Sequence, residues 1–194
     1  MSNYDSDPLQ VDSDDQPGGL SFTDNISVSW AAVDTAPDDA QLAKVNESNE
    51  TFLRAVSVLG SLGSDSTDED PAVGQEIARL DMKVNMLLDL VSQLVYAQSD
   101  IPPRTQVTVS ANELQWVASD LPASGDTVFM QVYIQHGTPK PLCFYGEIIS
   151  AAEEHAQGYA RVNYLGLSGS ARGWMEKLIF RHHRREVAYR RTRQ

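Results

Sequence analysis

The spacing of hydrophobic residues changes along the chain, and each spacing predicts a different element. In residues 26–30 (ISVSW) apolar side chains alternate with serines, which predicts a short extended segment with one apolar face. In residues 38–60 apolar side chains recur at alternating intervals of three and four, with Asn49 as the polar exception. This pattern predicts a helix that begins at Asp38 or Asp39, where carboxylates favour the positive end of the helix dipole.

The pattern over residues 72–97 is the clearest helical signal in the sequence. Its apolar positions follow intervals of four and three without a break: Val73, Ile77, Leu80, Val84, Leu87, Val91 and Leu94. This repeat of 3.5 residues is typical of a coiled coil, and its alternation of Ile or Val with Leu favours two strands. Leu88, Leu90 and Val95 widen the apolar face, which favours three or four strands, or packing of the 38–60 helix alongside. We call the seven residues from Val73 to Leu94 the seam, and we expect them to mediate self-association. The alternative is an ordinary amphipathic helix that is docked on its own core.

Residues 104–165 predict an all-β region. Short runs of alternating apolar residues are separated by turns such as SANE, LPASGD and HGTPKP. Strands of this length and spacing indicate a small antiparallel barrel, and Gly146 within one run fits a bend that helps the barrel to close. From about Ser170 the pattern is helical again, with Ser168 or Ser170 as its cap. The expected fold class is therefore α+β.

Charge is segregated along the 194 residues. Residues 1–70 hold 15 acidic and two basic side chains, whereas the last 24 residues hold eight basic and two acidic ones. We expect residues 1–19 to be a disordered acidic tail, because they are poor in apolar side chains. An oligomerising extension over residues 20–100 and a barrel with its basic helix over residues 101–194 complete the expected domains. Solvated ends are the simplest interpretation, although opposite charges also permit attraction between the two ends.

Candidate catalytic chemistry is sparse. No metal-binding or phosphate-binding motif and no GxSxG serine occurs, so we expect no enzyme activity, no metal and no cofactor. Cys143 lies within a strand pattern and is expected to be structural, and the adjacent His182 and His183 point apart on a helix. No signal peptide and no membrane-spanning run occurs, which favours the cytoplasm. RNA binding by the arginine tail is a distant alternative, because Tyr189 is the one aromatic residue among those arginines.

The order of these parts resembles the PilZ family. The segments VTVSANELQW, SGDTVFMQVYI and PLCFYGEII, followed by a helix, carry the resemblance. It implies the barrel and a site for cyclic di-GMP, a bacterial second messenger, built from an R-x-x-x-R motif and a D/N-x-S-x-x-G motif. Here Arg104 is the only arginine at the first motif, and Thr108, Ser110 and Glu113 stand at the second. Only Ser110 matches, and each lost charge-assisted hydrogen bond costs about 1.5–3 kcal/mol, so we expect weak or absent binding.

The chain is more similar still to an atypical proteobacterial subset of that family. The segments ISVSW, NESNETFLRAV and KLIFRHHRREVAYRR, placed around the heptad helix, carry this similarity. It implies an oligomer built on the long helix, with a tetramer favoured over a dimer. The expected function is that of a cytoplasmic, non-enzymatic signalling adaptor that contacts other signalling or motility proteins. The alternative is a receptor that binds cyclic di-GMP or another anion through Arg104 and the tail arginines Arg181, Arg184 and Arg185.

Overall fold

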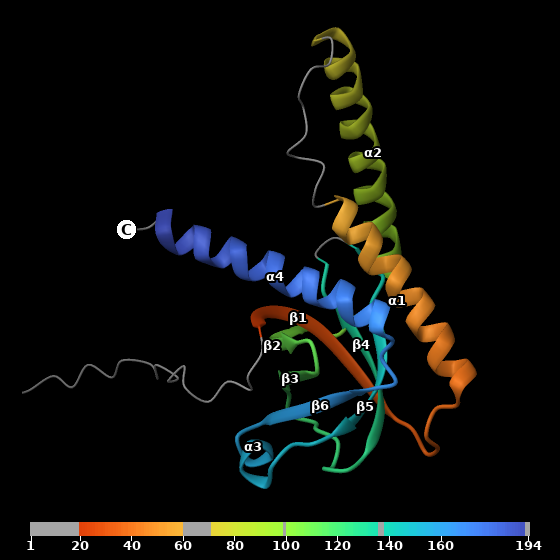
Figure 1. Cartoon of the computed structure of the whole chain (residues 1–194), viewed down its shortest axis with the longest axis vertical. Coiled ribbons are helices and arrows are strands. Elements are labelled where there is room, and N and C mark those ends of the chain that lie inside the picture. Colours follow the sequence, from red (N-terminus) through yellow and green to blue (C-terminus); the bar gives the residue numbers. More distant parts are fainter. Residues whose placement is uncertain (1–19, 60–70, 99, 136–137, 193–194) are drawn as a thin grey trace, which may run out of the picture.

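Six antiparallel strands close into a barrel, and helices lie against it or project from it (Figure 1). The computed structural model describes residues 20–59, 71–98, 100–135 and 138–192. The strands are β1 (Ser21–Ala32), β2 (Arg104–Ser110), β3 (Glu113–Val117), β4 (Thr127–Tyr133), β5 (Leu142–Ile148) and β6 (Tyr159–Leu165). The helices are α1 (Asp39–Leu59), α2 (Pro71–Gln98), α3 (Ala152–Ala156) and α4 (Gly169–Thr192). The expected acidic tail at residues 1–19 and the loop at residues 60–70 lie outside the described residues.

The first strand is longer than its sequence pattern predicts, and it belongs to the barrel. Residues 21–27 of β1 pair with β2, and residues 27–32 pair with β4. Ser27 is the crossover point, because it is paired with Arg104 on one side and with Tyr133 on the other. The barrel therefore draws one strand from the segment that we expected to form a separate extension.

The interior of the barrel follows the alternation that the sequence predicts for β2 to β6. Inward side chains on these strands are almost fully buried: Val107, Val109, Leu114, Trp116, Val128, Met130, Val132, Leu142, Phe144, Ile148 and Val162. Gly146 is required for a close approach between strands. A Cβ atom at this position would lie 2.2 Å from Cγ2 of Val162 and 2.8 Å from the carbonyl oxygen of Asn163. The absence of a side chain therefore lets β5 and β6 meet at this point.

Helix α1 begins where the sequence predicts, but it packs differently from our expectation. The Asp38 carboxylate accepts a hydrogen bond from the Gln41 amide at 2.8 Å, and the Gln41 side chain accepts one from the Asp38 amide at 2.9 Å. These reciprocal bonds cap the helix. Its apolar face is buried with the core, and α1 contacts α4 and β5. The expectation that α1 lies alongside α2 is therefore wrong for the described chain.

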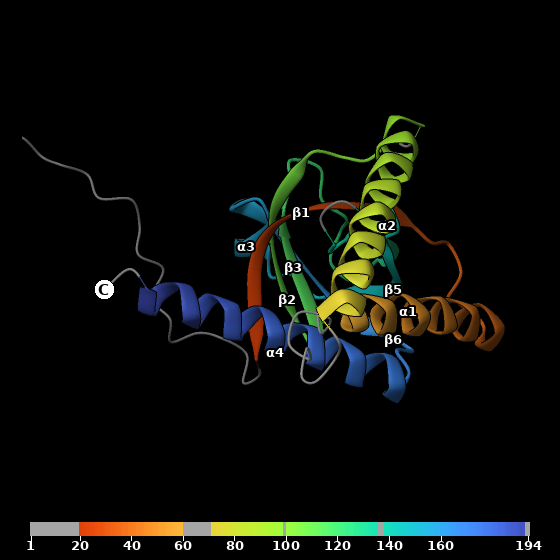
Figure 2. The ribbon, with the colours of Figure 1, turned by 90° about the horizontal axis from the view of Figure 1, so that it is seen from above.

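The three long helices have different relations to the barrel (Figure 2). Helix α4 begins after Ser168, whose hydroxyl accepts a hydrogen bond from the Ala171 amide at 3.0 Å, as a cap should. It then passes over β1 and β2 beside α1, with Met175, Leu178 and Ile179 buried beneath it. Helix α2 instead projects away from the barrel (Figure 1).

Candidate functional site

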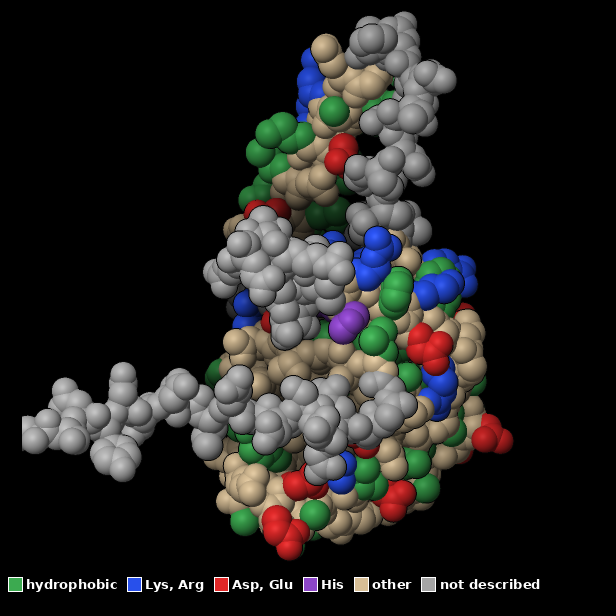
Figure 3. All heavy atoms as spheres, turned by 60° about the vertical axis from the view of Figure 1, so that its left-hand side comes forward, with side chains coloured by type: hydrophobic (Ala, Val, Ile, Leu, Met, Phe, Trp, Pro, Cys, Tyr) green, Lys and Arg blue, Asp and Glu red, His purple; other side chains and the backbone are tan. Residues whose placement is uncertain are grey.

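The apolar seam of helix α2 is exposed. Every seam residue from Val73 to Leu94 is between 49% and 62% exposed. Figure 3 shows hydrophobic side chains on this projecting part of the molecule. Monomeric proteins rarely expose a continuous apolar stripe of this kind, which usually marks an interaction site. The alternative from the sequence, a helix docked on its own core, is therefore wrong for α2.

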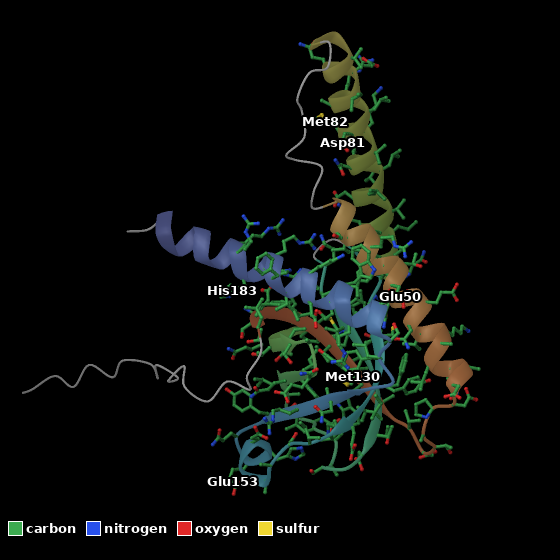
Figure 4. The ribbon with its side chains drawn as sticks, in the orientation of Figure 1. Glu50, Asp81, Met82, Met130, Glu153 and His183 are labelled. Carbon is green, nitrogen blue, oxygen red and sulfur yellow. The ribbon has the colours of Figure 1, made fainter. Side chains whose placement is uncertain are left out.

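Several polar residues of α2 pair with one another along the helix. Arg79 and Glu76 form an ion pair at 3.2 Å, and the Gln93 amide donates to the Asp89 carboxylate at 2.9 Å. Met82 lies on the side of the helix opposite the seam and is 69% exposed, and Figure 4 shows it on α2 well away from the barrel. The seam thus has a defined opposite face on the same helix.

The second candidate site is the β2–β3 turn, where the sequence places the altered ligand motif. The Ser110 hydroxyl accepts hydrogen bonds from the amides of Asn112 and Glu113, at 3.3 and 3.0 Å. It also donates to the Glu113 carbonyl at 3.0 Å. Ser110, the one residue that matches the motif, therefore uses its hydroxyl to form hydrogen bonds within the turn.

Two further residues, which sequence analysis missed, close this turn. The Tyr164 hydroxyl lies 3.2 Å from the Ser110 carbonyl oxygen and 3.1 Å from that of Glu113, so it donates to this pair of acceptors. Burial raises the pKa of Tyr164, and the nearby Glu113 carboxylate raises it further, against the smaller opposite effect of Arg172. The Arg172 guanidinium donates to the Ala111 carbonyl at 2.9 Å and to the Asn112 side chain. A cation from α4 thus contacts the turn.

The other predicted ligand residues do not gather around Ser110. Arg104 is exposed at the opposite end of β2, about 20 Å away at the usual rise of 3.3 Å per residue. Thr108 lies between them, and its hydroxyl is 2.8 Å from that of Thr23 on β1. Arg104 is consequently not positioned to share a ligand with the turn.

The tail arginines Arg181, Arg184 and Arg185 lie on α4. Arg181 donates to the Val56 carbonyl near the end of α1 at 3.1 Å, and burial together with the charge of Arg185 lowers its pKa. Arg184 and Arg185 are exposed on α4. Arg184 lies over the ring of Phe180, with its guanidinium carbon 5.9 Å from the ring centroid.

Polar residues of α1 hold the helices and the barrel together. The Asn49 side chain donates to the Cys143 carbonyl at 2.5 Å and accepts from the Cys143 amide at 3.0 Å. It thereby pairs with β5 as a neighbouring strand would, just before β6 begins to pair at Tyr145. Asn46 bonds to both Gly166 and Ser168, and Glu50 accepts from the Ser168 hydroxyl at 2.7 Å (Figure 4). Asn49 is therefore an anchor to the barrel and not a polar position in a coiled-coil seam.

Two other kinds of site are missing from the part of the chain that the structure covers. Within the described ranges, no group of three or more His, Cys, Asp or Glu side chains is arranged to hold a metal ion. No helix among those same residues has both the length and the apolar character needed to cross a bilayer. Burial raises the pKa of the Cys143 thiol, the single cysteine, which disfavours the reactive thiolate.

Comparison with known proteins agrees with this architecture. A crystal structure of a pathogenic protein from Xanthomonas campestris, described as a new tetrameric PilZ domain self-assembled via an unusual helical bundle, has a TM-score of 0.68. The match is 19% identical in sequence and covers 88% of this chain and 91% of that one. None of the curated proteins matches the chain significantly. The family model for the atypical PilZ domain, described as a cyclic di-GMP receptor, matches residues 53–192. With its six-stranded barrel and more than half of its length matched, the chain belongs to the atypical PilZ family.

Proposed function

We propose that this protein is a non-enzymatic, cytoplasmic signalling adaptor that assembles through α2 into a homo-oligomer, with a tetramer as the favoured state. The observation that carries the proposal is the exposed seam from Val73 to Leu94, which has no partner within the described chain. An apolar stripe of 3.5-residue period is best buried against copies of itself. Several barrels on one bundle would let weak contacts with signalling or motility proteins act together.

The tetramer is favoured for two reasons. Leu88, Leu90 and Val95 are exposed beside the seam, so the apolar face is wider than a two-stranded coil covers. The Xanthomonas protein of similar fold is described as a tetramer assembled through a helical bundle. The same topology in this chain leaves α2 free to form such a bundle.

Light scattering coupled to size-exclusion chromatography tests the assembly. We expect wild type at micromolar concentration to have about four times the subunit mass of 21.4 kDa, and Leu87→Asp to fall to one subunit mass. A carboxylate at this seam position would be buried without a partner in the bundle, which is strongly destabilising. Met82→Asp introduces the same charge on the opposite face and should leave the mass unchanged. A monomeric wild type, or an equal effect of both variants, would refute the proposal.

The same proposal includes weak or absent binding of cyclic di-GMP. Two observations support this part of the proposal. The side chains of Ser110, Tyr164 and Arg172 all form hydrogen bonds to the backbone of the β2–β3 turn, and Arg104 lies at the far end of β2. Glu113 adds a negative charge where an anionic ligand would approach. Calorimetric titration of the wild-type oligomer with cyclic di-GMP should therefore give no binding at micromolar concentration.

The alternative function is a receptor for cyclic di-GMP or another anion through Arg104 and the tail arginines. The observation in its favour is that Arg104, Arg184 and Arg185 are exposed cations in a family described as cyclic di-GMP receptors. Micromolar affinity that disappears in Arg104→Ala or in Arg184→Ala would establish this alternative. Binding that persists in both variants would assign the ligand to other residues.

A further inference from the structure

The start of β1 and the middle of α4 meet at a pair of stacked rings. Phe22 and His182 have ring centroids 4.2 Å apart and an interplanar angle of 14°. Figure 1 shows the beginning of β1, in red, directly below α4. Residues 1–19 therefore leave the described fold close to α4.

The solvent-exposed face of α4 carries positive charges. Lys177, Arg184 and Arg185 are exposed and take part in none of the ion pairs formed within the described ranges. Phe180 lies among them and is 55% exposed, although it is a large apolar side chain. We call Lys177, Phe180, Arg184 and Arg185 the basic face of α4. Its combination of cations and one exposed ring fits an acidic segment that also carries apolar side chains.

Residues 1–19 have this chemistry. They contain five aspartates and no lysine or arginine, with Leu9 and Val11 among the acidic positions. Asp15 lies seven residues before Phe22, so up to about 23 Å of extended chain joins them. This reach exceeds the diameter of α4, which is about 10–12 Å with side chains. Covalent attachment also raises the local concentration of such a segment to about the millimolar range.

We propose that the acidic segment of residues 1–19 docks on the basic face of α4 of its own chain. Docking neutralises cations that otherwise repel one another, and it covers the exposed Phe180 ring. The segment then competes with any other anion for Arg184 and Arg185. This inference does not depend on the assembly through α2, because the contact lies within one subunit.

Zero-length carbodiimide cross-linking of the full-length oligomer tests the contact. The reagent activates a carboxylate, and the amine of a lysine then displaces the reagent as a urea and forms an amide, so only touching pairs are joined. The chain has four lysines, and Lys177 is the one on α4. We expect peptides from residues 1–19 to be joined mainly to Lys177, several-fold more often than to Lys44 or Lys83. Comparable joining to all three lysines would overturn the proposal.

Matched variants separate docking from general charge attraction. Arg184→Ala with Arg185→Ala should lower the Lys177 cross-link several-fold, as should 1 M salt, which shortens the Debye length to about 3 Å. Replacement of Asp65, Asp68 and Asp70 by Asn removes acidic charge elsewhere and should leave the cross-link unchanged. An equal loss in this control would contradict specific docking. In oligomers mixed from two isotopic forms, cross-links should join residues of one form, and links between forms would contradict docking within the chain.

Discussion

At the scale of single residues, side-chain hydrogen bonds shape the β2–β3 turn. The Ser110 hydroxyl accepts a hydrogen bond within the turn, and the Tyr164 hydroxyl donates to the carbonyl oxygens of Ser110 and Glu113. Sequence alternation places Tyr164 correctly on the inner face of β6, but it gives no information about the bonding of its hydroxyl group. Arg172 was also missed, because its partners lie in a turn about 60 residues earlier in the chain.

Because the Tyr164 phenol is buried, the free energy of unfolding depends on pH in the alkaline range. Its pKa lies above the ordinary value of 10.0, so above pH 10 the unfolded chain releases a proton that the folded chain retains. The contribution of Tyr164 to the free energy of unfolding is complete below pH 10 and is lost as the pH rises above that value. We expect the free energy of unfolding of wild type to fall more steeply above pH 10 than that of Tyr164→Phe, by up to about 1.4 kcal/mol per pH unit. Urea titrations at pH 8 to 11 measure this difference, and parallel curves would contradict it.

At the scale of elements, α1 is attached to the barrel by amide side chains as much as by apolar packing. Asn49 pairs with both backbone groups of Cys143, and Asn46 and Glu50 bond the segment that begins α4. This helix therefore connects β5 to α4.

Asn49→Ala tests this connection. The variant leaves the amide and carbonyl of Cys143 without their partner in a largely buried position. We expect a loss of about 2–3 kcal/mol in the free energy of unfolding. Ser48→Ala changes the exposed neighbouring residue and should stay within about 0.5 kcal/mol of wild type. Chemical denaturation measures both variants, and a loss no larger than in Ser48→Ala would show that Asn49 is dispensable.

The limits of prediction at this scale have a physical cause. The short strands of residues 104–165, the start of a helix at Asp38 or Asp39 and the seam of α2 follow from local sequence patterns, and the structure contains each of them. The partners of α1 and β1 depend on contacts between distant segments. A buried asparagine in a heptad pattern has the same sequence signature whether it faces another coil or the edge of a strand. For Asn49 only the fold separates these two cases.

At the scale of the whole molecule, the proposed assembly through the projecting α2 would make stability depend on protein concentration. An oligomer that buries the seam is stabilised by mass action, because only folded chains associate. We expect the thermal midpoint of wild type to rise when the protein concentration increases from about 1 to 100 µM. The midpoint of Leu87→Asp should not change over this range. Differential scanning fluorimetry or calorimetry measures both midpoints. A wild-type midpoint that does not change with protein concentration would argue against a reversible assembly.

The position of β1 also sets an order of events during synthesis. β1 leaves the ribosome before the other strands, yet both of its neighbours in the barrel, β2 and β4, follow α1 and α2 in the sequence. Translation proceeds at about 5–20 residues per second, so the apolar α2 emerges seconds before the barrel is able to close. The seam of α2 is thus outside the ribosome for seconds while the barrel of its own chain is still incomplete.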